Sequence, residues 1–212
     1  STIMSAVTIG YWNIRGLAAA LRMMCMYAGQ PFENKVYRVT ETYGREEWLV
    51  QSKPDLKEKH ALINLPYIID GDIIVSQSNA CLSYLGRKFD MWGLTPHEVV
   101  CCEELLCEIM DLRNNFTAFT YGRAGDPSDK NKVQDFLAAA RSGILAKLEL
   151  YLSRNPHFSA QTPFLVAGHI TAPDFHCFEM LDQYSFLAKY YDLVLLDETL
   201  PLMGTYYNEF MK

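Results

Sequence analysis

The first residue that could do chemistry in this chain is Tyr11, in the segment TIGYWNIRG. The segment is typical of a β-strand that ends in a polar turn containing Arg15 and Gly16. A tyrosine at a strand end is either a half-buried core aromatic or a hydroxyl presented to a ligand. The segment by itself leaves both interpretations open.

Leu65 and Pro66 stand at the entry to another predicted strand, in NLPYIIDGD. A trans peptide is the common state of an X-Pro bond. A cis bond at this bend would point the backbone N–H and C=O of Leu65 outward, where an extended peptide could pair with them as a further strand does. The site would then suit a peptide-like ligand.

Two further groups of residues could hold carboxylates. In SQSNA, Gln77 and Ser78 precede a predicted helix whose free N–H groups favour an anion, although Ser78 is equally well explained as a helix cap. In REEW and just after it, Arg45, Trp48 and Lys53 could hold a second carboxylate. Taken separately, these three are surface charges and a half-buried tryptophan.

The elements that must position these residues fall into two parts. Strands are predicted at 6–12 and 34–39, a helix at 17–29, a hairpin at 65–78 and a helix from 78 onward, with the polar stretch 40–60 as a long connection holding one possible helical turn. From Thr95 onward long helical periodicities take over.

The helical part should contain a helix through 99–119, a second over 130–154, a third over 170–190 that opens with a capping box of Thr171 and Asp174, and a short last helix. We therefore expect an α/β domain over residues 1–89 and an all-helical domain over 90–212.

Composition excludes several classes of protein. The net charge is −6 and the basic residues are scattered, which argues against a nucleic-acid partner. No apolar run is long enough to span a membrane, and no signal peptide is visible, so we expect a cytoplasmic protein. The six cysteines lack metal-ligand spacing and are expected to be reduced, with no metal site.

The combination of GYWNIRGLA, REEWL, NLPYIIDGD, SQSNACLSYLGRK and ITAPDF resembles the cytosolic glutathione transferase family, in particular its mu class. The resemblance extends along nearly the whole chain. It implies the glutathione transferase fold, with a thioredoxin-like α/β domain followed by an all-α domain. Each fragment alone is weak, but together at these separations they are specific.

The resemblance assigns roles to these residues. Tyr11 would donate a hydrogen bond to the sulfur of reduced glutathione, the co-substrate, and so stabilise the nucleophilic thiolate. The glycine end of glutathione would be held by Trp12, Arg45, Trp48 and Lys53, the cysteine by Asn64 and Leu65, and the γ-glutamyl end by Gln77 and Ser78.

The helical domain would add Asp111 and Tyr121, which lie about 80° apart on one helix. By the resemblance, Asp111 reaches the γ-glutamyl amine across the interface of a homodimer, and Tyr121 with Leu17 contacts the electrophile. Without the resemblance, Asp111 and Tyr121 would be interpreted as a solvated acid and a half-buried tyrosine. The apolar residues Leu112, Phe116 and Phe119 are expected to line the helical side of the electrophile pocket.

The chain departs from the mu-class pattern in ways that change the expectations. The connection before Asn64 is longer and Lys53 stands one position later than the family lysine, so its assignment is open. Leu62 replaces an aromatic residue that acts as a key in the partner subunit, which implies a looser dimer. The loop 39–45 is slightly short and the chain stops at Lys212, so we expect a more open electrophile pocket.

The predicted function is therefore conjugation of glutathione to small hydrophobic electrophiles, without a metal. Two alternatives use the same fold: a non-catalytic ligand-binding or crystallin-like protein, and a glutathione-dependent isomerase. The tyrosine and the peptide-binding residues argue against the first, and the sequence does not discriminate against the second.

Overall fold

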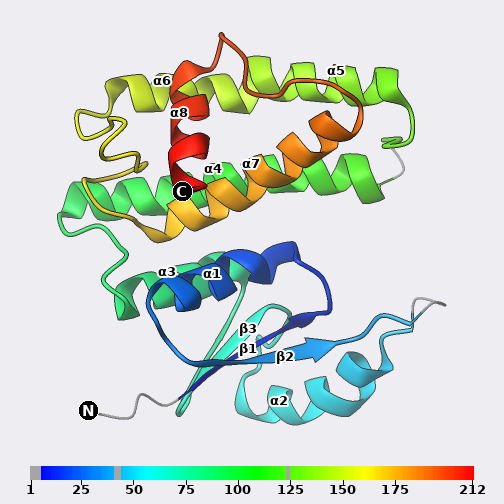
Figure 1. Cartoon of the computed structure of the whole chain (residues 1–212). Helices are drawn as coiled ribbons and strands as arrows, with labels where there is room; N and C mark the ends of the chain where they lie inside the picture. Colours follow the sequence, from blue (N-terminus) through cyan, green and yellow to red (C-terminus); the bar gives the residue numbers. More distant parts are fainter. Residues whose placement is uncertain (1–5, 41–43, 123–124) are drawn as a thin grey trace. The chain divides into compact units, whose positions relative to one another are not determined.

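The computed structural model describes residues 6–40, 44–122 and 125–212. The chain divides into two compact units, residues 1–91 and 92–212 (Figure 1). The first combines a sheet with helices and the second contains helices, so the predicted fold class is confirmed.

The first unit is built on a four-stranded mixed sheet. Its strands are β1 (Val7–Trp12), β2 (Phe32–Tyr37), β3 (Tyr67–Asp70) and β4 (Ile73–Ser76), in the order β2-β1-β3-β4. β1 and β2 are parallel, and the other two pairs are antiparallel. The parallel pair is joined by the crossover helix α1 (Ala19–Tyr27), as parallel strands require. The predicted strand, helix, strand and hairpin are all present.

The connection between β2 and β3 is more helical than the sequence suggested. A π-helical segment over Glu47–Ser52 leads directly into α2 (Lys53–Lys59), where we expected one turn. No residue of α2 is buried, so this helix carries no apolar stripe from which it could be predicted. Figure 1 shows α2 on one face of the sheet, with α1 and α3 (Ser78–Lys88) on the other.

An aromatic cluster fills the α2 face of the sheet. Tyr37, Trp48, Ile63 and Tyr67 are all buried there. The Trp48 ring lies 5.0 Å from Tyr37 and 5.9 Å from Tyr67, and the two phenol oxygens share a hydrogen bond of 2.7 Å. A Cβ at Gly10 would lie 2.2 Å from the Tyr67 ring, so only glycine lets that ring rest on β1.

The second unit is a bundle of five α-helices within the described residues 92–122 and 125–212. They are α4 (Pro96–Tyr121), α5 (Lys130–Ala140), α6 (Ala146–Arg154), α7 (Ala172–Tyr190) and α8 (Pro201–Phe210). The first, third and last predicted helices of this part are confirmed.

The single helix predicted over 130–154 is wrong. α5 and α6 are separated by a π-helical segment, Arg141–Leu145, in which Gly143 leaves helical geometry with φ −100° and ψ −105°. Glycine has the weakest helix preference after proline, because it loses the most backbone freedom. The apolar periodicity continues through the interruption, and for this reason the sequence pattern concealed it.

The start of α7 is fixed by the predicted capping box. The Thr171 backbone N–H and hydroxyl both donate to Asp174 Oδ2 at 2.7 Å. The backbone N–H of Leu165 donates to Asp174 Oδ1 at 2.8 Å. Tyr206 of α8 donates its hydroxyl to the Asp174 carbonyl at 2.7 Å. Asp174 is fully buried, so this one residue ties the preceding loop, α7 and α8 together.

We expect Asp174→Asn to lower the free energy of unfolding by about 2–3 kcal/mol, because an amide nitrogen would replace an oxygen that accepts from two buried donors. Urea denaturation measures this directly. Asp135→Asn, on the exposed side of α5, is the control and should change stability by less than about 0.5 kcal/mol. Equal stability of the two variants would contradict the role given to this cap.

Candidate functional site

Tyr11 and Trp12 project to opposite faces of the sheet. Trp12 packs against the aromatic cluster on the α2 face. Neighbouring side chains of a strand alternate, so Tyr11 lies on the face that carries α1 and α3. Tyr11 is 4% exposed, and no hydrogen bond joins its hydroxyl to another residue in the described part of the chain. The structure thus places the Trp12 side chain on the face opposite Tyr11, a choice that the sequence left open.

The turn after β1 closes on the edge of the Tyr11 ring. Gly16 has φ +43°, and a Cβ there would lie 2.5 Å from Tyr11 Cε1 and 2.8 Å from its hydroxyl oxygen. Only a glycine backbone can approach the ring this closely. Leu17, the predicted electrophile contact, is half-buried in the short 3-10 turn that follows, Gly16–Ala18.

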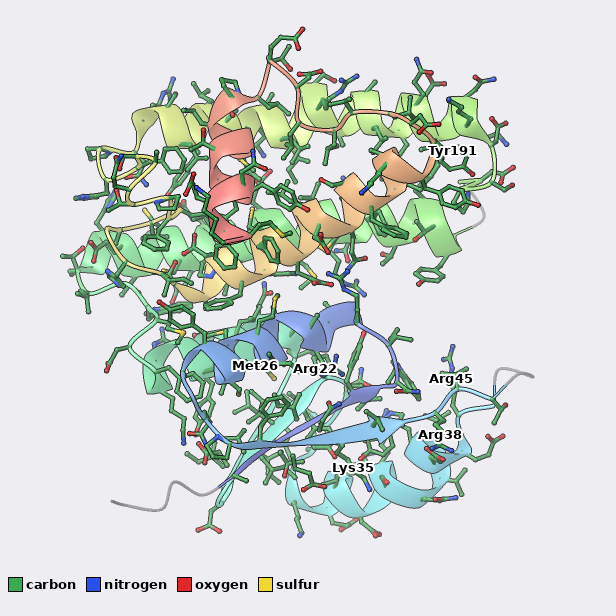
Figure 2. The ribbon with its side chains drawn as sticks, viewed as in Figure 1. Arg22, Met26, Lys35, Arg38, Arg45 and Tyr191 are labelled. Carbon is green, nitrogen blue, oxygen red and sulfur yellow. The ribbon has the colours of Figure 1, made fainter. Side chains whose placement is uncertain are left out.

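Arg22 of α1 holds the same turn in place by hydrogen bonds, a role that was not predicted from the sequence. Its guanidinium donates to the carbonyl of Ile14 at 3.2 Å and, through Nε, to Asn34 Oδ1 at 2.9 Å. Figure 2 labels this residue on α1. An arginine within the otherwise apolar run LAAALRMMCMYAG was the available signal. The turn that touches Tyr11 is therefore tied to both α1 and β2.

The peptide bond between Leu65 and Pro66 is cis, the less common of the two alternatives. The loop before it is fastened to β4, because the Asn64 backbone N–H donates to Ser76 Oγ at 3.1 Å and that hydroxyl donates to the Leu62 carbonyl at 2.9 Å. Neither backbone group of Leu65 bonds to another described residue. The Asn64 side chain is exposed, so both residues can meet a ligand.

Gln77 is held in an unusual backbone conformation between β4 and α3. It has φ +75° and ψ 127°, which is rare for a residue other than glycine and costs about 1–3 kcal/mol. Gln77, rather than Ser78, is the N-cap residue, and its side chain makes no capping bond. The capping explanation of Ser78 is therefore wrong. The N-terminus of a helix such as α3 suits an anion.

Three cations lie over aromatic rings on this face of the sheet, and the first, Lys35, has its Nζ 5.9 Å from the centre of the Tyr37 ring. The Arg45 guanidinium carbon is 5.7 Å from the centre of the Trp12 ring, and Lys53 Nζ is 5.8 Å from the Trp48 ring. Both distances fit cation–π contacts. Trp48 itself is 1% exposed, so it is a core residue and not the half-buried tryptophan of the simpler interpretation. Figure 2 labels Arg38 and Arg45 in the segment beyond β2, and Lys35 on β2 itself.

The cluster beneath these cations stays uncharged. Burial, and then the hydrogen bond that its hydroxyl shares with Tyr37, raise the pKa of Tyr67 far above its usual range. The positive charge of Arg45 and Lys53 is therefore not offset by a phenolate in the cluster, and the two side chains can serve an external carboxylate.

Asp111 and Tyr121 lie on α4, as predicted. Asp111 is exposed and lines a groove of about 580 Å³ between α4 and α6, together with Cys107, Lys147 and Tyr151. Tyr121 is the last residue of α4 and is 84% exposed. The half-buried tyrosine of the simpler interpretation is therefore wrong.

The apolar lining expected beside Tyr121 is partly wrong. Leu112 is fully buried and cannot line a pocket. Phe116 and Phe119 pack on Phe136 of α5 inside the helical unit, at ring distances of 6.3 and 4.2 Å. The sequence showed that these residues share a helix, but which face packs on α5 depends on tertiary structure.

The described residues include no group of three or more histidine, cysteine or acidic side chains that could hold a metal ion. The same part of the chain has no helix long and apolar enough to cross a membrane.

The four-stranded mixed sheet with helices on both faces and the cis peptide bond between Leu65 and Pro66 are the arrangement of a thioredoxin-like unit. Comparison with known families agrees. The profile of the "Glutathione S-transferase, N-terminal domain" matches residues 7–87, and that of the "Glutathione S-transferase, C-terminal domain" matches residues 110–212. The chain belongs to the glutathione S-transferase family.

Several mammalian relatives carry names of the mu class. The chain is 34% identical to glutathione S-transferase Mu 2 of Rattus norvegicus, over 84% of this chain and 76% of that one. It is 36% identical to Mu 6 of Mus musculus over the same shares, and 33% identical to glutathione S-transferase B of Cavia porcellus over 85% and 77%.

Solved structures with the same fold include nematode proteins. The Pi-class glutathione S-transferase of Onchocerca volvulus has a TM-score of 0.73 at 22% identity, covering 97% of this chain and 87% of that one. The monomeric Na-GST-3 of Necator americanus has a TM-score of 0.74 at 20% identity, covering 97% and 91%. At these identities the likeness shows the fold alone.

We expect Gly16→Ala to lower kcat/KM for conjugation of glutathione about tenfold or more, because the new methyl group would displace the Tyr11 hydroxyl. Gly29→Ala is a matched control: Gly29 also has a positive φ of 63°, but a Cβ there meets nothing within 4 Å. Both variants should lose about 1 kcal/mol of stability. If both kept native kcat/KM, the contact between Gly16 and Tyr11 would have no bearing on activity.

Proposed function

We propose that this chain conjugates reduced glutathione to small hydrophobic electrophiles, with the Tyr11 hydroxyl stabilising the glutathione thiolate. The observation that carries the proposal is the buried Tyr11, whose hydroxyl has no partner among the described residues and is held in place by the backbone of Gly16. Such a hydroxyl is a preorganised donor for a developing anion.

The remaining residues supply a complementary surface for the tripeptide. The Leu65 backbone offers the N–H and C=O that pair with the cysteine residue of glutathione, beside the Asn64 side chain. Gln77, Ser78 and the N-terminus of α3 receive the γ-glutamyl carboxylate. Arg45 and Lys53 receive the glycine carboxylate, oriented by the rings of Trp12 and Trp48 beneath them.

The chemistry requires a thiolate at neutral pH. A free thiol is mostly protonated there, and the hydrogen bond from Tyr11 favours the anion. The thiolate then attacks an electrophilic carbon, a carbon–sulfur bond forms, and the leaving group departs with the bonding electrons while the thiol proton passes to solvent. A shift of two pKa units corresponds to about 2.7 kcal/mol.

We expect Tyr11→Phe to lower kcat/KM about 100-fold in an assay with glutathione and 1-chloro-2,4-dinitrobenzene, since about 2.7 kcal/mol of thiolate stabilisation is lost. The pH at which activity rises should move up by about two units, because that pH reports the thiol. Glutathione binding, measured by calorimetry, should change little. Tyr27→Phe, an exposed tyrosine at the end of α1, is the control and should behave as the native protein.

Two results would go against this proposal in different ways. Full activity of Tyr11→Phe would remove the role of the tyrosine and leave the enzyme intact. A native protein that binds glutathione but conjugates no electrophile would be a binding protein on this fold.

We further propose that the chain forms a homodimer and works in the cytosol. Leu62 is 74% exposed, and it stands where the mu-class pattern has the aromatic residue that enters the partner subunit. Asp111 lines an open groove from which it can reach a glutathione held by the other subunit. All six cysteines are free, which suits a reducing compartment.

Sedimentation at micromolar concentration should show a dimer, and Leu62→Asp should shift it toward monomer. Leu94→Asp is the matched control, because Leu94 is 77% exposed and offers the same side chain elsewhere on the surface. A native protein that sediments only as a monomer, the state named for Na-GST-3, would remove the role of Asp111 across the interface and leave conjugation untouched.

A further inference from the structure

The α2 face of the sheet carries one more cation than the proposed function uses. Arg45 and Lys53 are proposed to receive the glycine carboxylate of glutathione. The third cation is Lys35 of β2, whose Nζ lies 5.9 Å from the centre of the Tyr37 ring. Figure 2 labels Lys35 on β2 and Arg45 in the segment that follows this strand. No role has yet been given to Lys35.

The Tyr37 ring lies beside both of the rings that carry the other two cations. Its centre is 5.0 Å from that of Trp48, the ring under Lys53. Tyr37 is also the register partner of Trp12 in the parallel pair of β1 and β2, and Trp12 lies under Arg45. Partners on neighbouring strands lie about 5 Å apart and project to the same face. The ring under the third cation therefore adjoins the rings under the other two.

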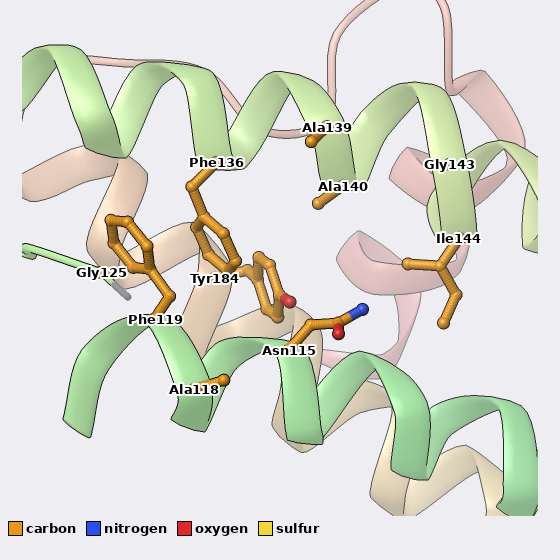
Figure 3. Close-up of a pocket in the computed structure, with 10 residues that line it drawn as sticks. All are labelled: Asn115, Ala118, Phe119, Gly125, Phe136, Ala139, Ala140, Gly143, Ile144 and Tyr184. Carbon is orange, nitrogen blue, oxygen red and sulfur yellow. The ribbon is translucent and has the colours of Figure 1, made fainter. Parts of the chain in front are cut away.

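The three cations have no acidic partner in the part of the chain that the structure describes. No ion pair or hydrogen bond joins Lys35, Arg45 or Lys53 to a carboxylate there. The hollow between α4, α5 and α7 in the helical unit differs, because its lining residues are all uncharged (Figure 3). An anionic ligand therefore meets unpaired positive charge in the α/β unit and none in that hollow.

The acids on and beside β2 are bound to other groups. Glu33 Oε2 accepts a hydrogen bond from Thr8 Oγ1 at 3.3 Å. Glu47 Oε2 accepts one from the backbone N–H of Arg38 at 2.9 Å. The phenol of Tyr67 stays uncharged, because burial raises its pKa far above the usual range. Both carboxylates are thus committed to donors other than the three cations.

Glutathione brings a single carboxylate to this end of the site. Once Arg45 and Lys53 hold it, the charge of Lys35 is still unbalanced. Lys35 and Arg45 are exposed and Lys53 is half-buried, so a ligand in solvent can reach all three. A lysine ammonium carries three donors on a flexible four-carbon stem and can adjust to an anion on a side chain of the ligand. A second carboxylate next to the first would complete this arrangement.

We infer that the site also accepts thiol peptides that carry a second carboxylate on their third residue, and that Lys35 receives this carboxylate. The class is a γ-glutamyl-cysteinyl peptide with an acidic last residue, for example γ-glutamyl-cysteinyl-glutamate, in which glutamate replaces the glycine of glutathione. The inference rests on the proposed function, since it places both peptides in the same site. The thiol chemistry at Tyr11 is the same for both.

Titration calorimetry with the two reduced peptides tests the inference. The native protein should bind γ-glutamyl-cysteinyl-glutamate about fivefold more tightly than glutathione at low salt, as one exposed ion pair allows. The difference should shrink in about 0.5 M sodium chloride, because salt screens such a pair. Lys35→Gln should bind the two peptides equally and keep the native affinity for glutathione. Lys57→Gln removes the same charge from the exposed side of α2 and, as the matched control, should keep the preference.

Conjugation kinetics with 1-chloro-2,4-dinitrobenzene give a second readout. KM for the acidic peptide should be about fivefold lower than KM for glutathione at an equal kcat, because the added contact is the same in the ground state and the transition state. Equal or weaker binding of the acidic peptide by the native protein, or a preference that Lys35→Gln retains, would overturn the role of Lys35 and leave conjugation of glutathione intact. A protein that binds neither peptide would overturn the glutathione site itself, and this inference with it.

Discussion

The packing of Tyr67 on the bare backbone of Gly10 is the constraint on which the α/β unit depends. Because β1 lacks a side chain at this point, the Tyr67 ring lies against the strand and its hydroxyl meets that of Tyr37. Trp48 then stacks on Tyr67 and anchors the helical connection between β2 and β3. The aromatic cluster therefore packs against β1 on the face opposite to the Tyr11 side chain.

The same cluster supports the two cations proposed to receive the glycine carboxylate. Arg45 and Lys53 lie over rings that pack on or within it, so their charges are positioned by the core rather than by flexible loops alone. Rigid aromatic supports reduce the conformational entropy that long cationic side chains lose when they bind a carboxylate. The helical unit is organised in a comparable way, by a buried carboxylate that joins three segments at the start of α7.

Much of the fold could be predicted from local patterns. The strand at Tyr11, the hairpin around Gly71 and the cap formed by Thr171 and Asp174 each have short-range signatures, and each is present. The polar α2 and the interruption at Gly143 could not be predicted, because the first buries no residue and the second lies within an unbroken apolar repeat.

The site residues also divide into those with a local sequence signal and those without one. Motifs brought Tyr11, Leu65 and Gln77 to attention, since their positions at strand ends are local. The contact of Gly16 with the Tyr11 ring and the bond from Arg22 to the turn depend on the conformation that the turn adopts, and the burial of Leu112 depends on packing between helices. No spacing in the chain encodes such distances.

The turn after β1 also bears on how this protein can diversify. Only its inner edge, at Gly16, touches the Tyr11 ring, while Asn13 and Ile14 project outward and are exposed. Substitutions on the outer edge can therefore accumulate without moving the hydroxyl. The outer edge of the turn can thus change in size and polarity while the packing of Gly16 on the Tyr11 ring stays the same.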